Sequence, residues 1–251
     1  MTARRHPPSS RTRLCLLLTL SLVVASLGAL LTLATGMATL FLARRLYARM
    51  ATAIARTILR LWSIRLEIVP QRPWPTGQVV YISNHPCTLD LFVLVALGLP
   101  NTRFFLSGHL KKYLPIGVLA WLMGTFFTVP QDRPAERNRI FQRADRVLRR
   151  TAESVYLSPE GGRVANGSIG AFNKGAFHLA ASLGVPIVPL YFDVPDAVTP
   201  GMGVDARPGT VRVHVLPPID TRPWRVADVP RHRDEVHALY LTWHDTLRRP
   251  A

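Results

Sequence analysis

The first 62 residues differ in pattern from the rest of the chain. Residues 1–13 are polar and carry four arginines, and residues 14–43 then run for 30 positions without a charged side chain. A run of this length is typical of a membrane-embedded helix. As one straight helix it would be about 45 Å long against about 30 Å of hydrocarbon, so we expect it to tilt, bend or form a helical hairpin. A cleaved signal peptide is the alternative, because basic residues precede the run.

Residues 45–62 show a second pattern, in which apolar residues and arginines take opposite sides of a helix. The apolar side holds Leu46, Met50, Ile54, Ile58, Leu61 and Trp62, and the basic side holds Arg45, Arg49, Arg56 and Arg60. This pattern is typical of a helix that lies in the membrane interface with its arginines toward lipid headgroups. An amphipathic helix docked on a globular domain gives the same pattern. We therefore expect a basic, mobile N-terminus over residues 1–13 and a membrane-embedded and interfacial helical segment over residues 14–62.

From residue 63 onward, short apolar strands alternate with helical patterns. The expected strands are 64–68, 78–82, 103–106, 125–129, 154–157, 185–192 and 210–216, and the expected helices are 89–97, 115–123, 135–151, 169–183 and 229–249. Strands that alternate with helices indicate an α/β fold. We expect one globular domain over residues 63–251.

Charge and cysteine content narrow the function classes. The net charge is +16, carried by 28 arginines and 3 lysines. This charge fits an anionic membrane surface or a phosphate-bearing substrate. Nucleic acid is not an expected partner, because no zinc-finger spacing or basic and aromatic interleaving accompanies the charge. With only Cys15 and Cys87, a disulfide framework is not expected, and a reducing compartment fits.

The most informative polar stretch is residues 79–90, Val-Val-Tyr-Ile-Ser-Asn-His-Pro-Cys-Thr-Leu-Asp. A strand ends there and delivers His85 into a turn favoured by Pro86, and Asp90 begins the next helix. On one continuous helix the two side chains would lie about 140° apart, so they meet only if His85 sits in the turn. A histidine oriented by a carboxylate is a candidate general base. Alone the pair is weak evidence, because eight His and ten Asp can supply one such spacing by chance.

Four separated blocks carry polar or turn chemistry at the ends of the expected strands. They are Asn-His-Pro-Cys-Thr-Leu-Asp at 84–90, Gly-Thr-Phe-Phe-Thr-Val-Pro-Gln-Asp-Arg at 124–133, Ser-Pro-Glu-Gly-Gly-Arg at 158–163 and Val-Pro-Ile-Val-Pro at 185–189. In this order, over roughly residues 64–220, they resemble the glycerolipid acyltransferases, the family of lysophosphatidic acid acyltransferases. The resemblance implies a two-layer or three-layer α/β acyltransferase domain with a mixed sheet.

The resemblance also implies roles for individual residues. His85 would remove the proton from a glycerol hydroxyl as it attacks an acyl thioester, and Asp90 would orient the imidazole. The residues expected to bind substrate are Asn84, Arg133, Glu160, Gly161, Gly162 and Arg163. The acyl donor would be acyl-CoA or an acyl carrier protein (acyl-ACP), with no cofactor and no metal ion. The block at 185–189 is expected to be a buried strand that shapes the acyl channel.

This chain departs from the family pattern near the expected phosphate site. Gly162 stands where the family usually has threonine, Ser158 where it usually has an aromatic residue, and Arg133 lies beyond a small insertion at 130–132. Besides lysophosphatidic acid, the acceptor could therefore be another lysolipid, such as a lyso-ornithine lipid or a lysophospholipid. An alternative of another class is a non-catalytic lipid-binding protein.

The expected partners are membrane lipids, a lysophospholipid acceptor and an acyl carrier protein. Because acyl thioesters are cytoplasmic, we expect the protein at the inner (cytoplasmic) membrane of the cell, with its catalytic domain facing the cytoplasm.

Overall fold

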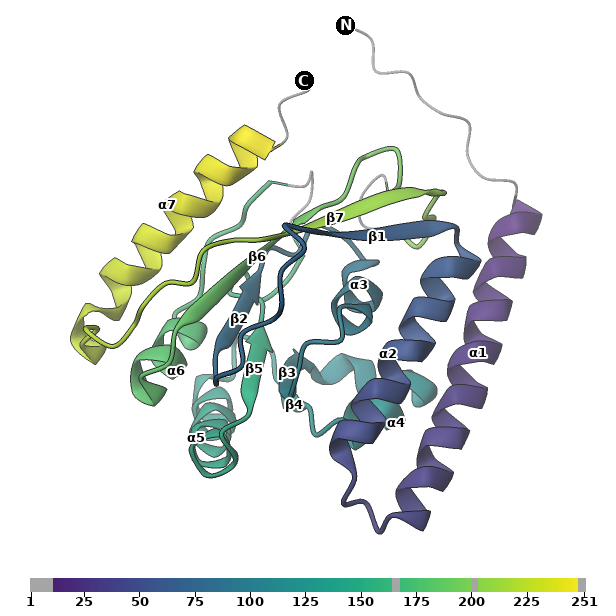
Figure 1. The fold of residues 1–251 in the computed structure, drawn as a ribbon, viewed down its shortest axis with the longest axis horizontal. Helices are drawn as coiled ribbons and strands as arrows, with labels where there is room; N and C mark the ends of the chain where they lie inside the picture. Colours follow the sequence, from purple (N-terminus) through teal and green to yellow (C-terminus); the bar gives the residue numbers. More distant parts are fainter. Residues whose placement is uncertain (1–10, 164–167, 200–202, 248–251) are drawn as a thin grey trace, which may run out of the picture.

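The computed structural model describes residues 11–163, 168–199 and 203–247. Its N-terminal part is a pair of helices, α1 (Arg11–Ala38) and α2 (Arg44–Leu61), that run in opposite directions side by side (Figure 1). Of the segment expected to be a mobile N-terminus, residues 1–10 lie outside the described residues and residues 11–13 belong to α1. Among the described residues, α1 is the one helix that is long and apolar enough to cross a membrane, judged by length and composition alone.

The glycines of α1 serve close packing. Helix α1 continues through Gly28 and Gly36, and the chain turns only at residues 39–43. A Cβ atom on Gly28 would clash with the side chain of Ile54, so a larger residue there would force Ile54 to shift where α1 meets α2. The Trp62 indole N–H donates to Ser21 Oγ at 2.8 Å. The two helices of the hairpin are therefore α1 and α2. The charge-free run of residues 14–43 does not itself fold back into two helices.

Helix α2 is docked on the α/β domain, as in the alternative interpretation of its pattern. Leu46 of α2, which was expected on the apolar side of the helix, is 41% exposed. Arg44 pairs with the buried carboxylate of Glu153, which also pairs with Arg103. The residues that α2 buries are Tyr47, Ala51, Ala55, Ile58 and Leu59. Tyrosine and alanine thus form much of the buried face, where the sequence pattern emphasised leucine, methionine and isoleucine.

The domain is built on a seven-stranded mixed sheet with the order β1-β7-β6-β2-β5-β3-β4. Among the strand pairs of the described residues, β6–β7 is antiparallel and the others are parallel. The strands are β1 (Ile64–Val69), β2 (Val80–Ser83), β3 (Thr102–Ser107), β4 (Phe126–Thr128), β5 (Ser154–Leu157), β6 (Ile187–Asp193) and β7 (Gly209–Val215). The remaining helices are α3 (Asp90–Ala96), α4 (Leu114–Leu122), α5 (Pro134–Thr151), α6 (Gly175–Leu183) and α7 (Val229–Leu247), with 3₁₀ turns η1 (Gly108–Lys112) and η3 (Val226–Asp228).

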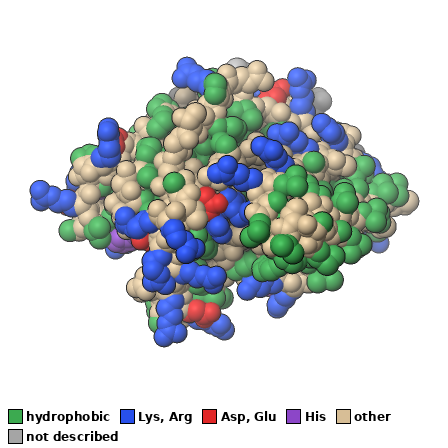
Figure 2. All heavy atoms as spheres, turned by 60° about the horizontal axis from the view of Figure 1, so that its bottom comes forward, with side chains coloured by type: hydrophobic (Ala, Val, Ile, Leu, Met, Phe, Trp, Pro, Cys, Tyr) green, Lys and Arg blue, Asp and Glu red, His purple; other side chains and the backbone are tan. Residues whose placement is uncertain are grey.

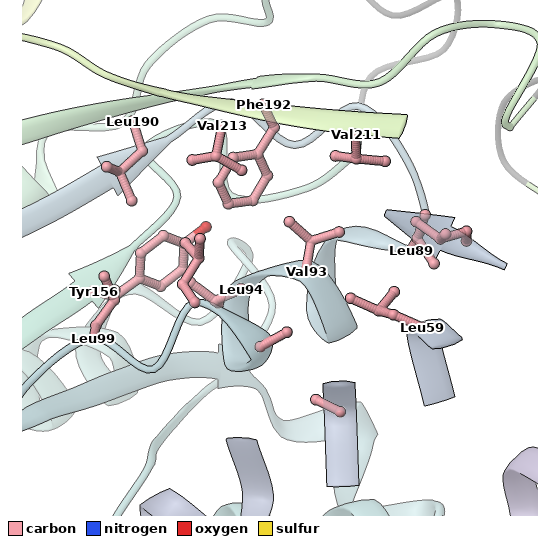
Figure 3. Close-up of a cluster of buried hydrophobic side chains, with 14 of the residues drawn as sticks. Leu59, Leu89, Val93, Leu94, Leu99, Tyr156, Leu190, Phe192, Val211 and Val213 are labelled. Atoms are coloured by element: carbon pink, nitrogen blue, oxygen red, sulfur yellow. The ribbon is translucent and has the colours of Figure 1, made fainter. Parts of the chain in front are cut away.

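Helices cover both faces of the sheet, which gives three layers. Tyr81 of β2 points into a core with α2 and α3, whereas its neighbours Val80 and Ile82 point into a second core with α5, α6 and α7. Figure 3 shows the first core, with Val93 and Leu94 close to Phe192. Burial on both faces explains why all four residues of β2 are buried. The expected α/β fold with a mixed sheet is confirmed.

Candidate active site

Two polar loops meet at one edge of the sheet. Strands β2 and β5 are parallel neighbours, with Ile82 beside Leu157, so their carboxyl ends lie at the same edge. The loop after β2 carries His85, and the loop after β5 carries Glu160. Ligand sites of open α/β sheets form at this edge.

His85 and Asp90 are in contact, as the turn at Pro86 predicted. Asp90 is the first residue of α3 and is 3% exposed. Its Oδ2 lies 2.8 Å from Nδ1 of His85, whose side chain is 31% exposed. A carboxylate on Nδ1 favours the tautomer whose other nitrogen, Nε2, accepts a proton. The pair has the geometry of a general base with its orienting carboxylate.

Cys87 holds the carboxylate of Asp90 in place through two hydrogen bonds. Its backbone N–H donates to Asp90 Oδ2 at 3.0 Å, and its thiol donates to Asp90 Oδ1 at 3.1 Å. Burial and the neighbouring Asp90 charge raise the pKa of the Cys87 thiol. The thiol therefore stays protonated and serves as a hydrogen-bond donor, because a nucleophilic cysteine needs a lowered pKa.

The side chain of Asn84, expected to bind substrate, is hydrogen-bonded to the backbone of β6. Its side chain is 3% exposed and makes two hydrogen bonds with the backbone of Phe192. Asn84 Nδ2 donates to Phe192 O at 3.1 Å, and the Phe192 N–H donates to Asn84 Oδ1 at 2.7 Å. The amide is thus engaged within the protein, and substrate binding by Asn84 stays a prediction. Asn84 ties the turn that carries His85 to β6, the buried strand that the block at 185–189 predicted.

Glu160 is buried without a hydrogen bond to either carboxylate oxygen among the described residues. It is 7% exposed, and burial raises its pKa to about 8. The backbone N–H groups of His85 and Gly170 oppose this shift electrostatically, without completing a hydrogen bond. At neutral pH the side chain is therefore mostly an uncharged acid, which can both donate and accept a hydrogen bond.

The two glycines after Glu160 differ in their surroundings. Gly161 has a φ of +69°, and a Cβ there would lie 2.8 Å from Asn173 Nδ2, so glycine is needed. Gly162 has no neighbour within 4 Å of an added Cβ. Arg163 donates from Nη1 to the hydroxyl of Thr88, a residue between His85 and Asp90 in the chain. This bond joins the two loops.

The segment after residue 167 also belongs to the site, although the sequence predicted a helix from residue 169. Asn173 donates from its side chain to the carbonyl oxygens of Pro159 and Glu160 at 3.0 and 3.2 Å. Its backbone N–H donates to Pro159 O at 2.7 Å. These bonds hold residues 168–174 against the loop after β5, so α6 begins only at Gly175.

A hollow of about 350 Å³ opens beside these loops. It is lined by Gln131, Glu160, Gly161, Gly162, Arg163, Gly170, Ala171, Phe172 and Asn173. Arg133, which was expected here, does not line it; its exposed guanidinium lies 3.7 Å from the carboxylate of Glu136. Gln131 takes its place because the chain turns at 130–133 before α5 begins. Gln131 and residues 170–173 were not predicted as part of the site, and the small side chains of Gly170 and Ala171 are the one feature that could have pointed to them.

The arrangement can take a proton at Nε2 of His85 and bind an anionic or hydroxyl-bearing group in the hollow. Arginine suits phosphate oxygens because its guanidinium donates in a planar fork. No group of three or more His, Cys, Asp or Glu side chains within the described ranges is placed to hold a metal ion.

Comparisons with known proteins show to which family the chain is similar. A model of the acyltransferase family matches residues 64–193. The chain is 31% identical to mouse 1-acyl-sn-glycerol-3-phosphate acyltransferase alpha over 72% of its length, and this match covers 64% of the mouse protein, somewhat less than two-thirds. It is 31% identical to the human beta protein of the same name, over 74% of this chain and 67% of the human one.

The fold is similar to that of a solved structure, the 1-acyl-sn-glycerophosphate acyltransferase of Thermotoga maritima. The TM-score is 0.68 at 14% identity, over 93% of this chain and 99% of the other. At this identity the likeness concerns the fold, and it includes the N-terminal helices as well as the α/β domain.

Proposed function

Because the chain belongs to the acyltransferase family, we propose that it transfers a fatty acyl chain from an acyl thioester to the free hydroxyl of 1-acyl-glycerol-3-phosphate. The product is phosphatidic acid, a precursor in phospholipid biosynthesis. The observation that carries this proposal is the 2.8 Å contact between His85 and Asp90, set beside a hollow lined by Glu160 and Arg163.

In the proposed reaction His85 acts as the general base. Its Nε2 takes the proton of the acceptor hydroxyl while that oxygen bonds to the thioester carbonyl carbon. The carbon–sulfur bond then breaks, and the thiolate takes the proton from the imidazolium, so an ester and a free thiol result. Asp90 stabilises the imidazolium through Nδ1, and Cys87 holds Asp90 in place. Base assistance of this kind contributes about 10²- to 10⁴-fold to a rate.

The acceptor would bind with its phosphate toward Arg163 and its glycerol toward Glu160. Arg163 is exposed at the rim of the hollow, where its guanidinium can donate to phosphate oxygens. A neutral Glu160 can hydrogen-bond a glycerol oxygen without repelling the phosphate. The hollow brings both groups within reach of one small ligand.

Another lysolipid, such as a lysophospholipid or a lyso-ornithine lipid, is a second candidate acceptor. Arg163 is the one arginine among the lining residues, and the open space at Gly162 leaves room for a larger headgroup. Turnover of lysophosphatidic acid and of these lipids, compared at equal concentration, separates the candidates. A higher kcat/KM for another lysolipid would overturn the choice of acceptor while leaving the reaction type intact.

We place the enzyme at the cytoplasmic membrane, with the catalytic domain on the cytoplasmic side where acyl thioesters are available. The exposed leucines of α1 support contact with lipid, and the packing of Gly28 on Ile54 supports a retained helix over a cleaved signal peptide. Because α1 is tied to α2, and α2 to the domain, a re-entrant hairpin fits better than a straight span. An N-terminal tag should then lie on the same side of the membrane as the domain, so protease added to sealed vesicles should digest both or neither. Digestion of tag and domain from opposite sides would overturn this topology.

The decisive experiment measures thiol release. Purified protein in detergent micelles, given palmitoyl-CoA and lysophosphatidic acid, should release CoA, and the His85→Ala variant should not. If the protein is not catalytic, the unmodified protein and the His85→Ala variant should bind liposomes equally well. Neither should then release thiol with any lysolipid acceptor. That result would favour the non-catalytic lipid-binding alternative.

A further inference from the structure

Four of the six arginines of helix α5, at positions 139, 143, 146 and 150, are separated by four, three and four residues. This spacing puts them in one row, and all four are exposed. We call Arg139, Arg143, Arg146 and Arg150 the arginine row. At 1.5 Å per residue the row is about 16 Å long.

The arginine row has no acidic partner within the described residues. The two acids of α5 are used by arginines outside the row: Glu136 pairs with Arg133, and Asp145 pairs with Arg149. Like charges three and four residues apart destabilise a helix. Burial, together with the nearby charges of Arg143 and Arg150, lowers the pKa of Arg103. An exposed row with this uncompensated charge attracts an acidic surface.

The row faces away from the part of the protein expected to meet lipid. Helix α5 packs in the core on one face of the sheet, and the α1–α2 hairpin lies on the opposite face. Figure 2 shows the same separation: Lys and Arg side chains gather at the lower left, over α5, and hydrophobic side chains gather at the right, toward the hairpin. A flat bilayer that contacts α1 is therefore separated from the row by the sheet. This geometry favours a soluble acidic partner over lipid headgroups.

Helix α5 also leads to the proposed active site. It begins at Pro134, three residues after Gln131, which lines the hollow. A partner docked along the row would have one end near the hollow.

We propose that the arginine row is the docking surface for the acyl donor in the form of an acyl carrier protein, an acidic protein that carries the acyl chain as a thioester. The proposal rests on the proposed acyltransferase function and deepens it by naming the donor. Electrostatic docking of this kind acts mainly on the rate of encounter and weakens as salt rises.

The test compares two donors on one double variant, Arg143→Glu with Arg146→Glu. Each new glutamate lies four residues from a remaining arginine, Arg139 or Arg150, so the helix gains opposite-charge pairs and should stay folded. We expect kcat/KM with a palmitoyl-loaded acyl carrier protein to fall at least about tenfold and its salt dependence to flatten. With palmitoyl-CoA, kcat/KM should stay unchanged.

The matched control is Arg65→Glu with Arg72→Glu, which changes the net charge equally at exposed positions near β1, the opposite edge of the sheet from β4. It should lose neither activity. An unchanged kcat/KM for the carrier-protein donor in the α5 variant, or an equal fall with both donors or in the control, would overturn the proposal. The proposal would also be overturned if the α5 variant lost binding to anionic vesicles but kept its turnover of the carrier-protein donor. If the unmodified protein uses palmitoyl-CoA only, the row is not a carrier-protein site although the proposed function stands. No turnover with either donor overturns the proposed function itself.

Discussion

The buried carboxyl group of Glu160 should make the stability of the protein depend on pH. Its pKa is about 8 in the folded protein, against 4.5 in a solvated chain, because burial disfavours the charged form. Between these two values the unfolded chain has released its proton while the folded chain keeps it. Stability is therefore greatest below pH 4.5 with respect to this group, and it falls as the pH rises toward 8.

Replacing the acid by its neutral amide should remove this dependence. One pKa unit corresponds to about 1.4 kcal/mol, so the 2.5 units between 4.5 and 7 give about 3 kcal/mol at pH 7. Relative to the unmodified protein, Glu160→Gln should gain stability on that order at pH 7 and almost none at pH 4.5. Because other titrating groups act equally in both proteins, the difference isolates Glu160.

The assay is urea unfolding in detergent micelles at several pH values from 4.5 to 8, followed by tryptophan fluorescence. Glu67→Gln serves as the control, since Glu67 lies on β1, away from the hollow, and pairs with Arg65 and Arg212. A constant difference between Glu160→Gln and the unmodified protein across this range would refute the argument. It would mean that the folded protein holds Glu160 with an ordinary pKa.

The remaining predictions concern the two loops. His85→Ala should lower kcat in the thiol-release assay by about 10²- to 10⁴-fold without lowering the unfolding temperature, and a matching loss of both would indicate a structural role. Cys87→Ala leaves Asp90 Oδ1 without its donor and should lower kcat about tenfold, whereas Cys87→Ser keeps a donor and should restore it; equal losses would contradict this role. Gly161→Ala should cost about 1–3 kcal/mol in thermal unfolding and Gly162→Ala almost nothing, so equal effects would refute the difference in their surroundings.

Local patterns predicted most of the elements because their causes are local. The expected strand 154–157 and the helix 135–151 agree with β5 and α5 to within one residue. The prediction of a helix from residue 169 was wrong because Asn173 hydrogen-bonds to Pro159 and Glu160. The hydrophobic pattern of residues 169–183 contains no information about these bonds. Tertiary hydrogen bonds overrode helix propensity there.

The same distinction separates the site residues that could be predicted from those that could not. His85 and Asp90 are five residues apart, and one proline sets the turn that joins them. Asn84 lies 108 positions from Phe192, the residue that occupies its amide, so its role is visible only in the fold. Arg133 matched the expected block by composition, but the turn before α5 leaves Gln131 at the hollow.

Proton transfer and acceptor recognition therefore rest on different kinds of structure. His85, Cys87 and Asp90 are joined by three hydrogen bonds within one turn, so any change there affects the base whichever lipid is bound. The acceptor side consists of an open position at Gly162 and an exposed Arg163, whose surroundings leave room for other headgroups. Substitutions in the turn should then lower turnover of every lysolipid by the same factor. Substitutions at the rim of the hollow should change the ratio between lysolipids, because only there does the protein meet what distinguishes them.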